Sequence, residues 1–337
     1  MKGLAIIFSF LFLILTSCEI SNKNKYNTGT FPGEPVNLGD INSEYDDYNS
    51  ASPIIGEAFP LCFSSNRHNQ GVDFDIIYKL LDVHMERENG KLTVAENTNI
   101  WNEFASQNAN ILNALSHLNT SSDELGPYLI PQAKNYNYEG RNSSYIFLYS
   151  TNEGGNQDIR FVHNLDGEYY NNPKPVSYLN SDEDDAYPSL SKDFSTLYFC
   201  SDREANFDIY TVSLDTNMSL LSNLEDSIPK AVILNAVLSS DSDDKCPFVL
   251  NNLIVFTSNR PGGFGGFDLY YALYKAGKWS DPVNFGNKIN TQYDEYRPIV
   301  KPMQEFTNDF MLFSSNRPGG KGGFDLYYVG IDRKLTE

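Results

Sequence analysis

The sequence has few cysteines and histidines, and no pattern groups them. Its 337 residues include four of each, and the histidines are scattered along the chain. No Cys-x-x-Cys pair or cysteine–histidine cluster occurs, so no zinc site or other metal site of this kind is expected. Cys62 and Cys200 lie in apolar, strand-like runs and are predicted to be buried thiols. With Cys246 they form an odd set, which cannot be fully paired within one chain.

Basic residues are also scarce. Lysine and arginine number 25 against 44 acidic residues, which gives a formal net charge of −19. Binding to nucleic acid or to an anionic membrane surface requires a basic patch, so the composition argues against both partners. The signatures Gly-x-Ser-x-Gly and His-Glu-x-x-His are absent. The glycine-rich stretches lack the Lys-Ser/Thr of a phosphate loop and are expected to be structural turns.

An apolar run near the start of the chain is too short for a comfortable membrane span. It covers residues 3–15, and residues 15–18 read Leu-Thr-Ser-Cys, which resembles a bacterial lipobox. The sequence therefore predicts a signal peptide at 1–17 and a lipidated Cys18. An uncleaved anchor or an ordinary signal peptide is the alternative. Asparagine-rich residues 18–33 then form a flexible tether.

What the sequence does contain is repetition. Residues 257–273 read TSNRPGGFGGFDLYYAL, and residues 314–330 read SSNRPGGKGGFDLYYVG. Related stretches begin at Cys62, Leu148 and Tyr198. A catalytic loop is normally needed once, whereas a unit that tiles must be copied, so the five copies indicate a repeat architecture.

Each copy joins an apolar run, a Ser-Asn-Arg-like segment, a variable turn and an aspartate that begins the next apolar run. The repeated arginines are Arg67, Arg203, Arg260 and Arg317, and the repeated aspartates are Asp75, Asp158, Asp208, Asp268 and Asp325. In the second copy Glu153 replaces the arginine. We expect the aspartates to accept hydrogen bonds from backbone amides in their hairpins.

Each unit offers four strands, the fourth from a Pro-Val-like segment such as residues 281–286. Four antiparallel strands in repeated units predict an all-β propeller of five blades over residues 34–337. Residues 85–117 are interpreted as an insertion with a short helix. A six-bladed ring that uses 85–115 as a degenerate blade is the alternative. The last unit has no fourth strand, and residues 34–39 should supply it by pairing with 324–331.

A pair of acidic residues precedes each copy. The pairs are Asp46/Asp47, Asp123/Glu124, Asp184/Asp185, Asp243/Asp244 and Asp294/Glu295. Four pairs have a proline four residues after the first acid, and the first copy is interpreted as carrying three extra residues. Repetition would place a ring of carboxylates at one mouth of the channel, where a cation such as calcium or a basic peptide could bind. The favoured interpretation is structural: the acids cap turns and pair with the repeated arginines.

The motifs TSNRPGGFGGFDLYYA, SSNRPGGKGGFDLYYV and YDEYRPIV resemble the WD40-like, TolB-related propeller repeat of bacterial envelope proteins, of the Bacteroidetes type. The resemblance covers residues 34–332. It implies an outer-membrane lipoprotein, periplasmic or surface-exposed and held to the membrane through Cys18. It also implies a non-catalytic scaffold that binds envelope proteins or glycans. No OmpA-like domain is recognised, so cell-wall anchoring is not carried over.

The alternative function is that of a five-bladed glycoside hydrolase with two carboxylates in its axial cleft. Catalytic acids should break the symmetry of the repeat, whereas the notable acids obey it. The acids of the insertion have no recognised spacing; they are Glu86, Glu88, Glu96 and Glu103. On this argument the sequence predicts a binding protein and no enzyme.

Overall fold

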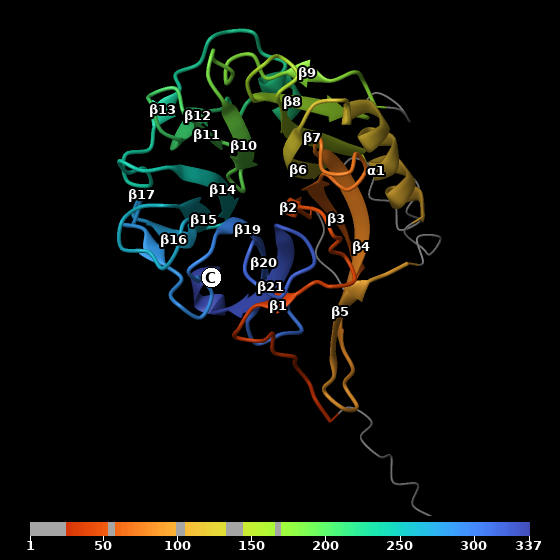
Figure 1. Cartoon of the computed structure of the whole chain (residues 1–337). Coiled ribbons are helices and arrows are strands. Elements are labelled where there is room, and N and C mark those ends of the chain that lie inside the picture. Colours follow the sequence, from red (N-terminus) through yellow and green to blue (C-terminus); the bar gives the residue numbers. More distant parts are fainter. Residues whose placement is uncertain (1–24, 53–57, 99–104, 133–143, 166–169) are drawn as a thin grey trace, which may run out of the picture.

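Five antiparallel sheets surround a central axis and form a five-bladed β-propeller (Figure 1). The structure is a computed structural model that describes residues 25–52, 58–98, 105–132, 144–165 and 170–337. The predicted five-bladed fold is confirmed, and the six-bladed alternative is wrong. The predicted signal peptide and Cys18 lie outside the described residues. No described helix is long and apolar enough to cross a membrane.

The first three blades follow the chain from the innermost strand outward. Blade 1 comprises β2 (Asp47–Ala51), β3 (Ala58–Ser65), β4 (Asp75–Met85) and β5 (Leu92–Glu96). Blade 2 comprises β6 (Glu124–Gln132), β7 (Ser144–Thr151), β8 (Asp158–His163) and β9 (Lys174–Pro175). Blade 3 comprises β10 (Asp185–Leu190), β11 (Thr196–Ser201), β12 (Asp208–Ser213) and β13 (Ile233–Leu234).

The last two blades differ in their outer strands. Blade 4 comprises β14 (Asp244–Leu250), β15 (Leu253–Ser258), β16 (Asp268–Lys275), β17 (Lys278–Trp279) and β18 (Val283–Asn284). Blade 5 comprises β19 (Glu295–Lys301), β20 (Asp309–Ser315), β21 (Asp325–Ile331) and the N-terminal strand β1 (Val36–Asn37). The helical elements are α1 (Ala105–Leu118), α2 (Leu220–Leu224) and the 3₁₀ turn Arg333–Leu335.

The ring is closed by the beginning of the chain. Val36 pairs with Tyr328 and Asn37 with Tyr327, so β1 is the outer strand of blade 5. This confirms the predicted closure. Each neighbouring pair of blades shares a cluster of buried apolar side chains, and the cluster between blades 1 and 5 includes Phe63 and Leu312. The apolar faces that a single sheet would expose are covered in this way.

The described residues between 85 and 117 do not form a separate blade. The far half of β4 pairs with β5 in a hairpin that projects from the ring (Figure 1). The helix α1 then packs Ile111, Ala114 and Leu118 against the cluster between blades 1 and 2. The expected short helix is therefore present. The fourth strand of blade 1 is β5, which lies within the stretch that was interpreted as an insertion.

Every innermost strand contains the same irregularity. Its pairing with the second strand skips two residues, and the first of these has a positive φ. The five positive-φ residues are Asn49, Gly126, Tyr187, Cys246 and Arg297. A proline follows in four blades, and Ser50 takes its place in blade 1. The interpretation of three extra residues in the first copy is therefore wrong, because β2 has the same register as the other four strands.

Candidate functional site

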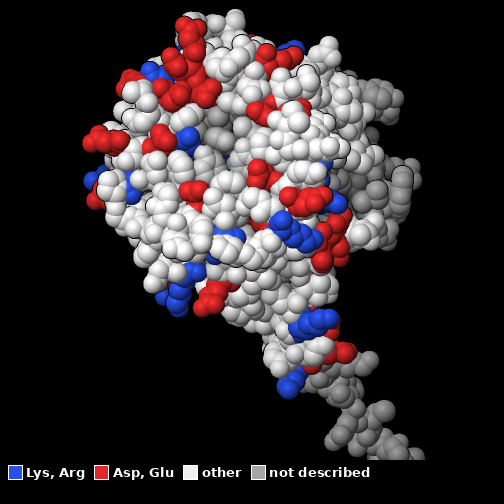
Figure 2. Space-filling model, viewed as in Figure 1, with Lys and Arg blue, Asp and Glu red and all other residues white. Residues whose placement is uncertain are grey.

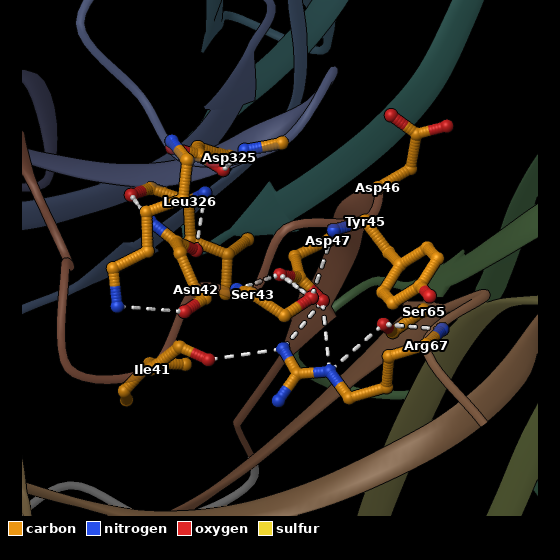
Figure 3. Close-up of polar contacts among 12 residues, drawn as sticks. Ile41, Asn42, Ser43, Tyr45, Asp46, Asp47, Ser65, Arg67, Asp325 and Leu326 are labelled. Carbon is orange, nitrogen blue, oxygen red and sulfur yellow. Dashed lines mark hydrogen bonds and ion pairs between the residues drawn. The ribbon is translucent and has the colours of Figure 1, made fainter. Parts of the chain in front are cut away.

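The second acid of each pair is a buried structural group. Asp47 is fully buried, and its carboxylate accepts hydrogen bonds from Ser43 N at 2.6 Å and from Arg67 Nη2 at 2.5 Å (Figure 3). Arg67 also donates to the carbonyl of Ile41 at 2.9 Å. The same arrangement recurs in three other blades, as Asp185–Arg203, Asp244–Arg260 and Glu295–Arg317. Each pair ties the turn before the innermost strand to the end of the second strand.

The first acid of each pair joins one blade to the preceding one. Asp46 in blade 1 accepts a hydrogen bond from Phe324 N in blade 5 at 2.7 Å. The corresponding acceptors in the other blades are Asp123, Asp184, Asp243 and Asp294. Among the described residues, no group of three or more His, Cys, Asp and Glu side chains is placed to hold a metal ion. Calcium binding by these acids stays a prediction.

The glycine-rich loops also take part in these contacts between neighbouring blades. This role explains why residues 257–273 and 314–330 are nearly identical. A Cβ atom at Gly265 would overlap the carbonyl oxygen of Tyr293, and one at Gly322 would overlap that of Tyr45. Each loop therefore packs directly on the acidic turn of the next blade, where a side chain has no room. Asp268 and Asp325 hold these loops by accepting hydrogen bonds from two of their backbone amides each.

The other three repeated aspartates have different surroundings. The carboxylate of Asp75 lies within hydrogen-bond distance of the His68 ring, at 3.1 Å. Burial raises the pKa of Asp158, and burial together with nearby Asp244 raises the pKa of Asp208 to about 6.

Blade 2 breaks the arginine pattern. Glu124 is fully buried, and its carboxyl group accepts hydrogen bonds from Thr120 and Thr151 but has no arginine partner. Glu153, which replaces the arginine, pairs with Arg160 instead. Burial without a compensating cation raises the pKa of Glu124 to about 7.

At the other end of the innermost strands lies a pocket on the propeller axis. All five innermost strands contribute to its lining, and its volume is about 260 Å³. Its walls include Tyr128 and Phe248, and two basic residues of β19, Arg297 and Lys301, also line it. Arg297 is fully buried and Lys301 is 9% exposed. At the acidic end of the axis, by contrast, aromatic rings such as Tyr48 and Phe74 pack together at 4.9 Å.

A larger pocket of about 700 Å³ continues outward between blades 3 and 4. The two pockets share the lining residues Ser191, Lys192, Val249 and Asn251, so they form one groove. The outer part is lined by Tyr198, Tyr274 and Trp279, and the Trp279 ring lies 5.1 Å from Tyr274 and 6.2 Å from Tyr198.

The aromatic wall comes from a feature that departs from the repeat. The strands β16 and β17 form a hairpin through Ala276 and Gly277, which have φ of 50° and 83°. Positive φ at both central residues is typical of a tight two-residue turn. Blades 2, 3 and 5 have no such hairpin among their described strands. The hairpin brings Tyr274 and Trp279 to the groove.

Carboxylates are placed unevenly along this groove. The described lining of the axial pocket contains none. The outer pocket is lined by Asp193 and Glu337. Asp193 accepts hydrogen bonds from Ser191 Oγ and Ser195 Oγ, both at 2.8 Å, and these bonds lower its pKa. Its carboxylate is therefore held in the ionised form.

Comparison with known proteins supports the fold. No family model and no curated protein sequence matches the chain. An α-L-arabinofuranosidase from Podospora anserina, solved with cellotriose, is 11% identical with a TM-score of 0.51, covering 90% of this chain and 96% of that one. A family 62 hydrolase solved with xylotriose is 9% identical with a TM-score of 0.52, covering 92% and 99%. At such identity the likeness establishes the five-bladed propeller and no more.

These neighbours correct the predicted function. Sequence reasoning favoured a non-catalytic scaffold and no enzyme, but the similar solved structures are glycoside hydrolases, in agreement with the alternative. The physical reason for the error is that sequence reasoning considered the repeated acids and those of the insertion, and did not consider the acids that line the groove. The repeated acids hold the blades together, whereas the groove is built from residues that do not repeat.

Sequence reasoning missed Arg297, Lys301, Tyr274 and Trp279. A signal for Arg297 was present in the repeat itself. The residue before the repeated proline is uncharged in blades 2 to 4 and is arginine in blade 5. Aligning the copies and asking which positions change charge would have marked this residue.

Proposed function

We propose that the protein is a carbohydrate-active enzyme that cleaves glycosidic bonds in the groove between blades 3 and 4. The observation that carries the proposal is the continuity of the aromatic outer pocket with the axial pocket. Aromatic side chains provide apolar faces on which sugar rings pack, and ligand sites are concave with a few convergent polar groups. The neighbours in the comparison support this reading, because they share the fold and hydrolyse glycosides.

Two carboxylates of the outer pocket are the candidates for the chemistry. Glycoside hydrolysis generally uses a pair of Asp or Glu residues on either side of the scissile bond. Asp193 is held ionised, as a base or nucleophile must be, and Glu337 supplies the second carboxylate. Placing the pair in the outer pocket also modifies the earlier alternative, which expected both acids in the axial cleft.

The test of the site is saccharide binding by wild type and by Tyr274→Ala, because Tyr274 is 41% exposed, whereas Trp279 is buried in the cluster between blades 3 and 4. We expect neutral oligosaccharides that bind the wild type to bind the variant at least tenfold more weakly, because the exposed ring of the aromatic wall is lost. The control is Tyr271→Ala, since Tyr271 packs against Phe285 at 4.9 Å on the outer part of the same blade. Equal binding by wild type and Tyr274→Ala would reject this groove as the saccharide site.

The cellular setting is proposed as the sequence suggested it. We retain residues 1–17 as a signal peptide, Cys18 as the lipidated residue, and the outer membrane as the location. The WD40-like, TolB-related repeat family also stays a proposal, supported by the repeated motifs. In this setting the envelope would supply glycans as substrates, and envelope proteins remain candidate partners.

A further inference from the structure

Charge at the floor of the axial pocket breaks the fivefold symmetry. The positions equivalent to Arg297 hold Asn49, Gly126, Tyr187 and Cys246. The propeller fold therefore requires no cation at this position. In an acidic protein of net charge −19, two basic residues on one strand that face one pocket call for a separate explanation.

Arg297 is poorly compensated where it lies. Its Nη2 is 3.3 Å from the carbonyl oxygen of Pro127 and 3.5 Å from that of Gly126. Its Nε and Nη1 have no hydrogen-bond partner among the described residues. The guanidinium carbon lies 5.4 Å from the ring of Tyr187. A guanidinium has five N–H donors, and leaving them unused in a buried site is costly.

Lys301 is in a similar state at the wall of the same pocket. Its ammonium group donates to the carbonyl of Ser52. Burial lowers its pKa to about 8. No ion pair among the described residues involves Lys301 or Arg297. A third cation, Lys192, lies where the axial and outer pockets meet.

We propose that the axial pocket binds the anionic substituent of an acidic saccharide, a carboxylate or a sulfate ester, through Lys301 and Arg297. The inference rests on the proposed function, because it names the substrate class of the same groove. A bound anion would supply the counter-charge that the described residues do not. The anion would contact Lys301, and Arg297, whose free nitrogens lie below the surface, would add positive charge at the floor of the pocket.

The test compares ligands that differ only in charge. A trisaccharide of a uronic acid, its methyl ester and a sulfated neutral trisaccharide are titrated calorimetrically into wild type and Lys301→Met. We expect the wild type to bind an acidic form at least tenfold more tightly than the methyl ester, and the variant to lose this difference. The uronate and sulfate arms show which anionic group the pocket prefers.

Two further variants separate binding from folding. Arg297→Met removes an unpaired buried charge, so the ligand-free variant should melt at or above the wild-type temperature while its preference for the acidic saccharide falls. Lys245→Met is the matched control, because Lys245 lies at the other end of an innermost strand, over Phe207 at 3.7 Å. It should leave the preference for the acidic saccharide unchanged.

The outcomes distinguish this inference from the proposed function. Equal binding of the acidic trisaccharide and its ester overturns the inference and leaves the saccharide groove intact. If no saccharide binds, inorganic sulfate and phosphate are tested by thermal shift. Stabilisation of wild type but not of Lys301→Met then supports an anion site while the proposed function fails. If neither sulfate nor phosphate stabilises the wild type, both the anion site and the proposed function are rejected.

Discussion

Replacing Glu124 by glutamine should stabilise the protein at alkaline pH and have little effect at acidic pH. Glu124 is the buried acid without an arginine, and its pKa is raised from 4.5 to about 7. Between these values the folded state keeps a proton that the unfolded state releases. The free energy of unfolding therefore falls as pH rises from about 4.5 to 7 and stays low above it. Glutamine resembles the protonated acid and does not titrate.

The size of the effect follows from the pKa difference. A difference of 7 − 4.5 = 2.5 pH units corresponds to about 2–3 kcal/mol between pH 5 and pH 8. The local hydrogen bonds permit the substitution. The amide oxygen can accept from Thr120 N, as the carboxyl group does at 3.0 Å, and the amide nitrogen can donate to the Thr120 and Thr151 hydroxyls.

The assay is chemical denaturation of wild type and Glu124→Gln at pH 5, 6, 7 and 8. The matched control is Glu295→Gln, in which the equivalent acid holds Arg317 at 2.9 Å. The control should be destabilised at pH 8, because the amide carries no charge to pair with Arg317, and its single oxygen cannot accept from both Thr291 N and Arg317 Nη2. A Glu124→Gln variant that loses stability at pH 8 as the control does would refute the reasoning.

Three further changes test the joints and the anchoring of the molecule. Asp294→Ala should lower the free energy of unfolding by about 1–3 kcal/mol, because the backbone amide of Phe267 loses its hydrogen-bond acceptor. If millimolar calcium stabilises the wild type and not the variant, the acids form a cation site instead. Deletion of residues 34–39 should increase hydrogen exchange at 324–331, and unchanged protection there would contradict the closure by β1. Cys18→Ser should release the protein from the membrane fraction, and a variant that still sediments with membranes would exclude lipid anchoring.

The ring and its joints could be predicted because they are repeated. Residues 34–39 match 281–286, and this match, together with the missing fourth strand of the last unit, located the closing strand. The acidic pairs likewise predicted turns that the arginines complete. Repetition works as evidence because each blade must meet its neighbour through the same contacts, so the same residue types recur at the same spacing.

The groove could not be predicted in the same way. It depends on the hairpin at 274–279, whose short Ala-Gly turn gives a weak sequence signal. It also depends on Arg297 being buried without an acid, and burial and pairing are properties of the assembled ring. The groove also brings together residues from different blades, and the sequence pattern within one blade does not indicate which of them lie close together.

Product analysis of oligosaccharides incubated with the wild-type protein, Glu337→Gln and Asp193→Asn tests the central claim most directly. Chromatography of the reaction should show shorter oligosaccharides from the wild type. Either variant should lower the rate at least a hundredfold while saccharide affinity stays within a few-fold, because a catalytic carboxylate contributes chiefly to the transition state. Saccharides that bind in the groove and are returned uncut by the wild type would contradict the account.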